Sequence, residues 1–292
     1  MSRESIEKIM SETEQKTNGS SRYTATGGEG YYVYCIADRD SSLEILRTAS
    51  VPSAMEENTE LEIITVDDLA AMVSRVPLSI FGEGSLDSYL SDAPWITVRA
   101  MRHEQVVEHF ARQTSVVPLR FGAIYLDRLG VERMLAEKHD QLRAILERLR
   151  GHEEWGVNVY CDRAVLLEKI TDLSPRLREM TATAKNASPG QSYLLQKKIE
   201  ALRADEGKLE IERTTKRIEE RLSSFSDGAS RLRVLKVETT EHGELKAKFA
   251  FLVLKTKFED FRAAAEEIAR EIETAGIRIE LTGPWPAYNF AA

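Results

Sequence analysis

The sequence predicts an α+β protein with two domains, the second of them ferredoxin-like (split βαβ) with an elaborated helical region. The chain has 292 residues, 42% of them hydrophobic, whereas a typical single domain holds about 100–150 residues. Segments with an apolar residue at every second position alternate with segments of helical period. From residue 154 onward the order is strand, helices, strand, strand, helix, strand, which is the split βαβ order.

We expect five segments along the chain. They are a mobile polar tail (1–30), a small N-terminal α+β domain (31–150), a C-terminal ferredoxin-like domain (151–292), a helical insertion within that domain (about 163–225) and an aromatic C-terminal tail (283–292). The first segment is rich in Ser, Thr, Glu and Gly. Such a composition buries too little apolar surface to offset its ordering entropy.

The N-terminal domain begins with a strand over 31–37, where aromatic and β-branched residues suit a half-buried pleated surface. Two apolar runs within 61–77 are parted by Asp67 and Asp68, and this pattern predicts a hairpin because aspartate can hydrogen-bond its own backbone in a turn. Over 95–113 the apolar positions fit one face of a helix, with Pro94 in its first turn. These positions are Ile96, Met101, Val106, Val107 and Phe110.

The rest of this domain is predicted to hold one strand and one helix. Residues 115–125 form a short strand, and Pro118 favours an edge or irregular position because proline donates no ladder hydrogen bond. Apolar residues at three- and four-residue steps predict a single helix over 127–150, ended by Gly151.

In the C-terminal domain, alternation over 154–161 predicts a strand with one buried face. Ser174-Pro175 and Ser188-Pro189 each place a capping hydroxyl before a proline at a first helical position, so we expect three helices up to about residue 225. The order is completed by strands over 231–238 and 244–255, a helix over 258–272 and a strand over 277–281. Right-handed crossovers place the helices on one face of the sheet. The other face must then be covered or serve as an interface.

Composition argues against several classes of partner. A net charge of −8 and an isoelectric point near 5.4 repel nucleic acid and anionic lipid. No stretch of about 18 uncharged apolar residues is present, so no membrane span is expected, and the first residues lack the apolar core of a signal peptide. Cys35 and Cys161 have no metal-ligand spacing around them, and we interpret both as small buried hydrophobes. A cytoplasmic protein is expected.

No catalytic, cofactor-binding or metal-binding constellation emerges from the spacing of residues. His103 and His109 are six residues apart, whereas a zinc helix needs four, so we expect surface or partly buried histidines. Arg120 is the one charge in an apolar strand segment, and its burial would require a carboxylate or carbonyl partner. We favour a structural ion pair for Arg120 over a functional anion site.

Two segments admit two interpretations each. Alternating charges over 197–221 fit either a solvated helix packed along one side or an arm that pairs with another helix or protein. The last stretch is either a strap folded over the protein's own domain or a partner-binding segment, since aromatic residues are enriched in interface cores. Its candidate residues are Pro284, Trp285, Pro286, Tyr288 and Phe290.

Four motifs, VVPLRFGAIY, EEWGVNVYCD, SPGQSYLLQKK and GPWPAYNF, occur in this order. Together they make the chain resemble the gas vesicle protein family GvpF/GvpL over about residues 30–290. The resemblance implies two α+β domains, the second ferredoxin-like, in a non-enzymatic accessory or minor structural component of gas vesicles. It implies no catalytic residues and no cofactors. It also implies that the protein binds the small hydrophobic shell protein GvpA and other gas vesicle proteins during assembly.

The leading hypothesis is therefore an assembly factor that binds its partners through surface fit, with sheet-edge pairing to the shell protein as one mode. The alternative is a small-ligand-sensing regulatory module, because ferredoxin-like sheets elsewhere serve as metabolite sites. An enzyme ranks third.

Overall fold

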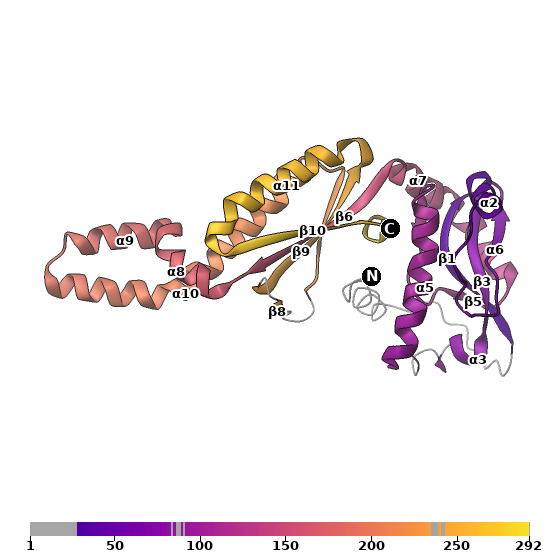
Figure 1. The fold of residues 1–292 in the computed structure, drawn as a ribbon, viewed down its shortest axis with the longest axis horizontal. Helices are drawn as coiled ribbons and strands as arrows, with labels where there is room; N and C mark the ends of the chain where they lie inside the picture. Colours follow the sequence, from indigo (N-terminus) through magenta and orange to yellow (C-terminus); the bar gives the residue numbers. More distant parts are fainter. Residues whose placement is uncertain are drawn as a thin grey trace. The chain divides into compact units, whose positions relative to one another are not determined.

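The computed structural model describes residues 28–291, apart from 83, 86–88, 90, 235–238 and 241–242, and it divides into two compact units (Figure 1). Unit 1 comprises the chain up to His152 together with Trp285–Ala292, and unit 2 comprises Glu153–Pro284. Each unit combines helices with a sheet, so the predicted α+β class is confirmed. The expected polar tail lies outside the described residues as far as residue 27. The end of the aromatic tail, which the sequence placed with the second domain, groups with unit 1.

The sheet of unit 1 is built around β1 (Glu29–Asp38), in the order β2-β3-β1-β4, with β5 also pairing with β1. Its other strands are β2 (Glu62–Val66), β3 (Leu69–Pro77), β4 (Val116–Pro118) and β5 (Ile124–Tyr125). β2 and β3 form the predicted antiparallel hairpin, in which Asp67 takes a φ of 50°. Aspartate tolerates this left-handed backbone better than most residues do. The segment around Pro118 is split into two strands, of which β4 ends the sheet order.

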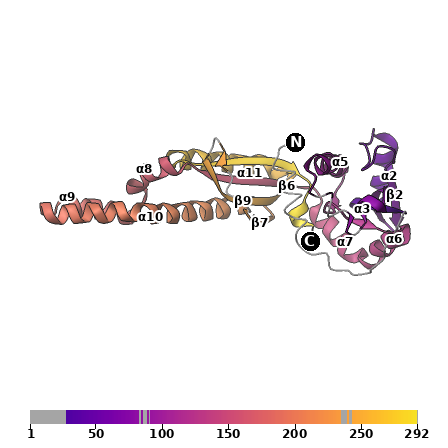
Figure 2. The same ribbon diagram turned by 90° about the horizontal axis from the view of Figure 1, so that it is seen from below.

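Helices cover both faces of this sheet. α5 (Ala93–Ala111) lies on one face, while α6 (Arg128–Glu137) and α7 (His139–Leu149) lie on the other (Figures 1 and 2). Two shorter helices, α2 (Arg39–Thr48) and α3 (Leu78–Phe81), follow β1 and β3. Asp92 caps the N-terminus of α5, because its carboxylate accepts a hydrogen bond from the Trp95 backbone N–H, and Pro94 lies in the first turn as predicted.

The prediction of one helix over 127–150 is wrong at Lys138, whose backbone angles (φ −105°, ψ 13°) lie outside the helical region. A tertiary cluster accompanies this break. His139 Nε2 lies 2.7 Å from Asp68 Oδ1, and Arg143 Nε lies 3.1 Å from Asp68 Oδ2. Hydrogen bonding to Asp68 raises the pKa of His139. The break thus lies beside contacts with a residue of the distant hairpin turn.

The predicted buried face of α5 is partly wrong. Met101 is 36% exposed, whereas Ala100 and His103 are completely buried. The buried stripe follows steps of three and four residues through Ile96, Ala100, His103, Val107 and Phe110. Counting apolar residues alone left a buried histidine out of this stripe.

The sheet of unit 2 has the order β10-β6-β9-β7, the ferredoxin-like arrangement, with β8 (Thr239–Thr240) also pairing with β9. Its four main strands are β6 (His152–Cys161), β7 (Gly228–Leu232), β9 (Gly243–Leu254) and β10 (Ile277–Trp285). β7 begins earlier than the predicted 231–238, part of which lies outside the described residues. β9 lies inside the sheet, as its continuous apolar run predicted.

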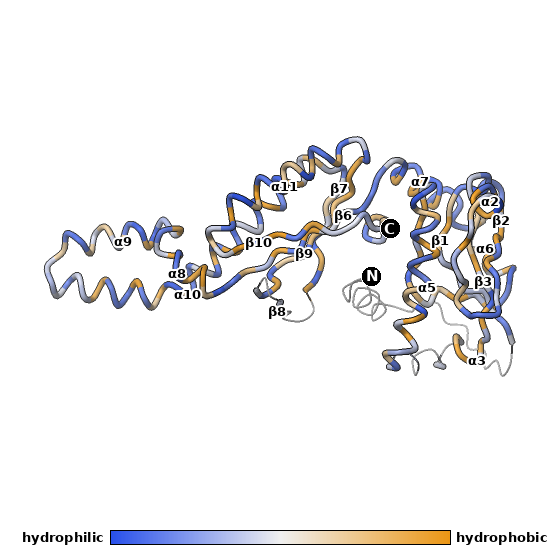
Figure 3. Tube along the Cα trace, in the orientation of Figure 1, coloured by the Kyte–Doolittle hydropathy of each residue, from blue (hydrophilic) through white to orange (hydrophobic). Residues whose placement is uncertain are grey.

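Three helices follow β6, and they break at the two predicted Ser-Pro pairs: α8 (Arg163–Leu173), α9 (Pro175–Lys185) and α10 (Pro189–Ser223). α11 (Phe258–Ile272) lies between the short 3-10 turns η1 (Lys255–Lys257) and η2 (Glu273–Ala275), and η3 (Tyr288–Phe290) lies near the chain end. α9 and the first part of α10 lie side by side as a helical hairpin that extends beyond the sheet of this unit (Figures 1 and 2). Its helices alternate between hydrophilic and hydrophobic segments, as amphipathic helices do (Figure 3).

One face of the unit 2 sheet shares a core with the helices. β6 and β9 contribute alternate residues, among them Val157, Val159, Phe249 and Phe251. The opposite face is polar where Asn158 and Tyr160 donate hydrogen bonds to Glu280 of β10, at 3.2 and 3.0 Å.

Replacing Gly276 by alanine should destabilise unit 2 by roughly 1–3 kcal/mol, the usual cost of strained backbone. Gly276 has a φ of 70°, and an added Cβ would lie 2.8 Å from Val165 Cβ. Gly190, in the first turn of α10, is the control, because nothing described lies within 4 Å of its added Cβ. Urea unfolding of Gly276→Ala and Gly190→Ala measures the difference. An equal loss of stability in both variants would contradict this account.

Candidate functional site

The predicted residues of the C-terminal tail are all described, and their surroundings differ. Pro284 is exposed, Pro286 is buried, and the three aromatic residues Trp285, Tyr288 and Phe290 are partly buried. Within unit 1, Arg148 of α7 donates a hydrogen bond to the carbonyl oxygen of Phe290. Tyr288 bonds two residues of α5. These contacts support the strap interpretation, while partner binding by the same rings stays a prediction.

Tyr288 belongs to a buried polar network with Tyr32, His103 and Glu104. Tyr32 Oη lies 2.8 Å from His103 Nδ1, and His103 Nε2 lies 3.1 Å from Tyr288 Oη. Tyr288 in turn donates to Glu104 Oε2 at 3.1 Å. His103 is 0% exposed and Glu104 is 7% exposed. Buried polar groups are costly without hydrogen-bond partners. The hydroxyl of Tyr288 supplies such a partner to both His103 and Glu104 of α5.

One arrangement of protons satisfies all of these bonds. Tyr32 donates to Nδ1 of His103, Nε2–H of His103 donates to Tyr288, and Tyr288 donates to Glu104. This arrangement needs a neutral imidazole. Burial lowers the pKa of His103 to about 4, since desolvation disfavours the charged ring. The histidine therefore stays neutral at pH 7 and links two tyrosines.

Aromatic packing surrounds this network. The ring of Tyr34 stacks on His103 with centroids 5.9 Å apart, and Tyr34 Oη bonds Ser74 Oγ at 2.8 Å and accepts from Met55 N at 2.7 Å. Desolvation raises the pKa of Tyr34 to about 12. The prediction from sequence did not include Tyr32, Tyr34 or Glu104 as site residues. The available signal was the place of His103 on the buried stripe of α5.

Arg120 is exposed in the turn between β4 and β5. Its charge is therefore not buried, and burial was the reason to expect a partner. Its ion pair stays a prediction. His109 is partly buried as expected, whereas the expectation is wrong for His103. Among the described residues, no group of three or more His, Cys, Asp or Glu side chains could hold a metal ion.

The two cysteines are free and buried, and burial raises the pKa of Cys161 to about 11. A thiol with so high a pKa carries little of the reactive thiolate at pH 7. The interpretation of both as small buried hydrophobes agrees with these surroundings. No helix in the described part of the chain is long and apolar enough to cross a membrane.

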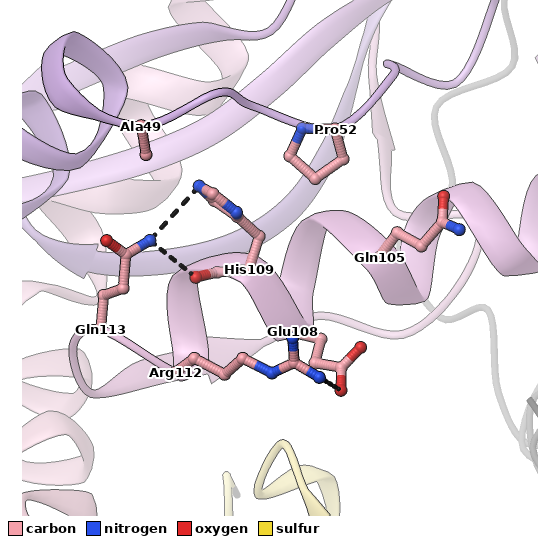
Figure 4. Close-up of a pocket in the computed structure, with 7 residues that line it drawn as sticks. All are labelled: Ala49, Pro52, Gln105, Glu108, His109, Arg112 and Gln113. Carbon is pink, nitrogen blue, oxygen red and sulfur yellow. Dashed lines mark hydrogen bonds and ion pairs between the residues drawn. The ribbon is translucent and has the colours of Figure 1, made fainter.

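A pocket of about 480 Å³ opens beside the C-terminal half of α5 (Figure 4). It is lined by Ala49, Pro52, Gln105, Glu108, His109, Arg112 and Gln113. Arg112 pairs with Glu108 at 2.6 Å, and Gln113 donates to the carbonyl oxygen of His109 at 3.0 Å. The two opposite charges of the pocket thus neutralise each other. The pocket belongs to unit 1, whereas the small-ligand alternative concerned the ferredoxin-like sheet of unit 2.

These features define a class of two-unit α+β proteins, in which the second unit is ferredoxin-like and the first includes the chain's own C-terminal segment. The family described as gas vesicle synthesis protein GvpL/GvpF matches residues 30–292, and the chain belongs to this family. It is a family of gas vesicle proteins and is not known as an enzyme family. Membership gives the chain a role in gas vesicles.

Relatives and solved structures agree with this membership. Gas vesicle protein L of Streptomyces sp. is 30% identical over 77% of this chain and 80% of its own length. Gas vesicle protein L1 of Halobacterium salinarum is 25% identical over 96% and 95% of the two chains. The crystal structure of GvpF from Anabaena has a TM-score of 0.63 at 18% identity, covering 91% of this chain and 97% of that one. GvpF from Microcystis aeruginosa has a TM-score of 0.58, covering 90% and 99%.

Replacing Tyr288 by phenylalanine should lower the free energy of unfolding of unit 1 by about 1–3 kcal/mol. The change removes the hydroxyl that bonds both His103 and Glu104, at 3.1 Å each. Tyr193→Phe is the control, because Tyr193 is 59% exposed and water can replace its hydroxyl. Hydrogen exchange measured by mass spectrometry should show faster exchange in α5 peptides of Tyr288→Phe. Unchanged exchange there would refute the strap.

Lowering the pH from 7 to 5 should cost unit 1 about 2 kcal/mol through His103. A histidine in the unfolded chain binds a proton near pH 6.5, whereas burial holds the folded pKa of His103 at about 4. Between these values the unfolded state binds more protons, so this contribution is complete above pH 6.5 and falls as the pH drops toward 4. Urea unfolding at pH 7 and 5 should show a smaller loss for His103→Asn than for the wild type. Equal losses would contradict the assignment.

Proposed function

We propose that this chain is an accessory or minor structural protein that binds the shell protein GvpA and other gas vesicle proteins and so assists gas vesicle assembly. Family membership supports the gas vesicle role, and the names of the relatives place them all among gas vesicle proteins. The protein works in the cytoplasm and at the gas vesicle, without a catalytic step or a cofactor. Its contribution is a set of surfaces that hold other polypeptides.

The observation that carries the binding mode is the edge strand β10. It has nine residues and stands at the end of the order β10-β6-β9-β7. The other strands that end a described sheet are shorter, since β2 and β7 have five residues each and β4 has three. A longer edge offers more main-chain hydrogen bonds to an added strand. β10 is therefore the edge best suited to an extended segment of a partner.

The side chains of β10 suit such a partner as well. Ile277 is buried and Ile279 partly buried on the core side, while Arg278 and Glu280 are exposed. An added strand would extend the core side with its own apolar residues and place polar residues opposite Arg278 and Glu280. A small hydrophobic, strand-forming shell protein fits this alternation.

Regulation by a small ligand is the second candidate function, and no described feature of unit 2 favours it over the first. The described pocket lies in unit 1, and its Arg112 is already paired with Glu108. A specific metabolite that raised the melting temperature would favour this second function. At a hundredfold excess over its dissociation constant, such a ligand would stabilise the folded protein by about 2.7 kcal/mol.

The wild-type protein should co-sediment with GvpA and keep it soluble, and a photo-reactive amino acid at position 278 should crosslink to it. Arg278 is exposed on β10, so the replacement leaves the core intact. The same amino acid at position 216 is the control, because Lys216 is exposed on α10, away from this edge.

Two outcomes separate the parts of this proposal. Absence of any GvpA co-sedimentation would count against the function itself. Co-sedimentation with equal crosslinking from positions 278 and 216 would keep the function and refute the edge strand as its site.

A further inference from the structure

The free end of the helical hairpin in unit 2 carries a second surface suited to another polypeptide. We define this arm tip by Lys185 at the end of α9 and by Tyr193, Leu194, Lys197 and Lys198 in the first turns of α10. We propose that the arm tip docks an acidic segment of another protein, through its two apolar side chains and its lysines. The proposal depends neither on the β10 edge nor on GvpA.

The apolar side chains of the arm tip take no part in the core of unit 2. Tyr193 is 59% exposed, and Leu194 at 67% is the most exposed large hydrophobic residue that the structure describes. The inner face of α10 is supplied by other residues, among them Ile199 and Leu202, which pack against the core. Scattered exposed apolar residues are ordinary. Here two adjacent exposed apolar residues, Tyr193 and Leu194, lie one helical turn from lysines that make no ion pair within the described part of the chain. This combination favours a binding surface.

The positive charge around the arm tip indicates an acidic partner. Between residues 174 and 204 the chain has six basic and two acidic side chains, a net charge of +4, although the whole chain carries −8. Arg176 and Arg203 of this stretch pair with glutamates. Within the described part of the chain, Lys185, Lys197 and Lys198 make no ion pair. Lys197 Nζ instead lies 5.9 Å from the centre of the Tyr193 ring.

The geometry of α10 groups these residues. Tyr193 and Lys197 are four residues apart, as are Leu194 and Lys198, so each pair shares a face of the helix. A partner that meets this face contacts apolar and cationic groups together. Tyrosine is among the residues enriched at energetically important interface positions.

The root of the hairpin is fixed by Glu206 of α10, whose side chain is 3% exposed. Its carboxylate accepts hydrogen bonds from Ser174 Oγ at 2.8 Å and from Arg176 at 3.3 Å. Ser174 Oγ also caps α9 by accepting from Leu177 N at 3.2 Å. This network holds α9 and α10 together before a partner arrives, and a preformed surface loses less entropy on binding.

Charge also favours another protein over the other occupants. Two copies of a chain with a net charge of −8 repel each other. An anionic lipid surface would repel most of the same chain, and two apolar side chains give little area to insert between lipids. An acidic segment short enough to contact only the arm tip meets the local net charge of +4, since salt screens the more distant acidic residues, and its apolar residues can pack on Tyr193 and Leu194.

Fluorescence anisotropy with the full-length protein tests the proposal, using three helical probe peptides. One is made of Glu and Leu, one has Lys in place of Glu, and one has Ser in place of Leu. We expect the Glu/Leu peptide to bind about tenfold more tightly than either of the others, which corresponds to about 1.4 kcal/mol. Tyr193→Ser with Leu194→Ser, and separately Lys197→Glu with Lys198→Glu, should each weaken this binding about tenfold.

Lys216→Glu is the charge control, because Lys216 is exposed on α10 outside the arm tip. It should leave binding of the Glu/Leu peptide unchanged, and melting temperatures should show that all variants are folded. Equal binding of the Ser-containing acidic peptide, or full binding by both arm-tip variants, would overturn the proposal. Arm-tip-dependent self-association in sedimentation velocity would overturn it in favour of a second copy. Arm-tip-dependent binding to phosphatidylserine vesicles, without binding to the Glu/Leu peptide, would overturn it in favour of a membrane.

Discussion

Burial of His103 and Glu104 on α5 is the constraint on which unit 1 depends. Both residues lie where apolar side chains would ordinarily pack, so each needs hydrogen bonds that water cannot supply. Tyr32 of β1 satisfies one nitrogen of the histidine, and Tyr288 serves the other nitrogen and the carboxylate. Strand, helix and C-terminal segment are thereby tied to one geometry, because a half-satisfied network would cost more than an apolar core.

Unit 2 meets a similar demand in a different way. One of its buried carboxylates, that of Glu206, lies where three helices meet, and it accepts hydrogen bonds from Ser174 and Arg176. These hydrogen bonds join α9 and α10 at the root of the hairpin. β10 ends the described sheet and the arm tip ends the hairpin, so the two binding surfaces that we propose for this unit belong to different elements.

Elements with a local signal were predictable from the sequence. The Ser-Pro pairs at 174–175 and 188–189 mark helix starts through capping and proline geometry, and the breaks occur there. The break at Lys138 escaped prediction because it accompanies contacts with Asp68, which lies 71 residues from His139. The sequence singled out the aromatic tail as a candidate segment, but it did not indicate the residues of α5 that Tyr288 contacts. A histidine within an apolar stripe reveals its burial only once the strand facing it is known.

The division of unit 1 along the chain has a consequence for its synthesis. The ribosome completes all of Glu153–Pro284 before it makes Trp285–Ala292, a delay on the order of ten seconds at about 5–20 residues per second. Throughout that time His103 and Glu104 of α5 lack the hydroxyl group of Tyr288 as a hydrogen-bond partner. A nascent chain that stops early leaves its first unit unfinished. Completion of that unit therefore requires that translation has passed Tyr288.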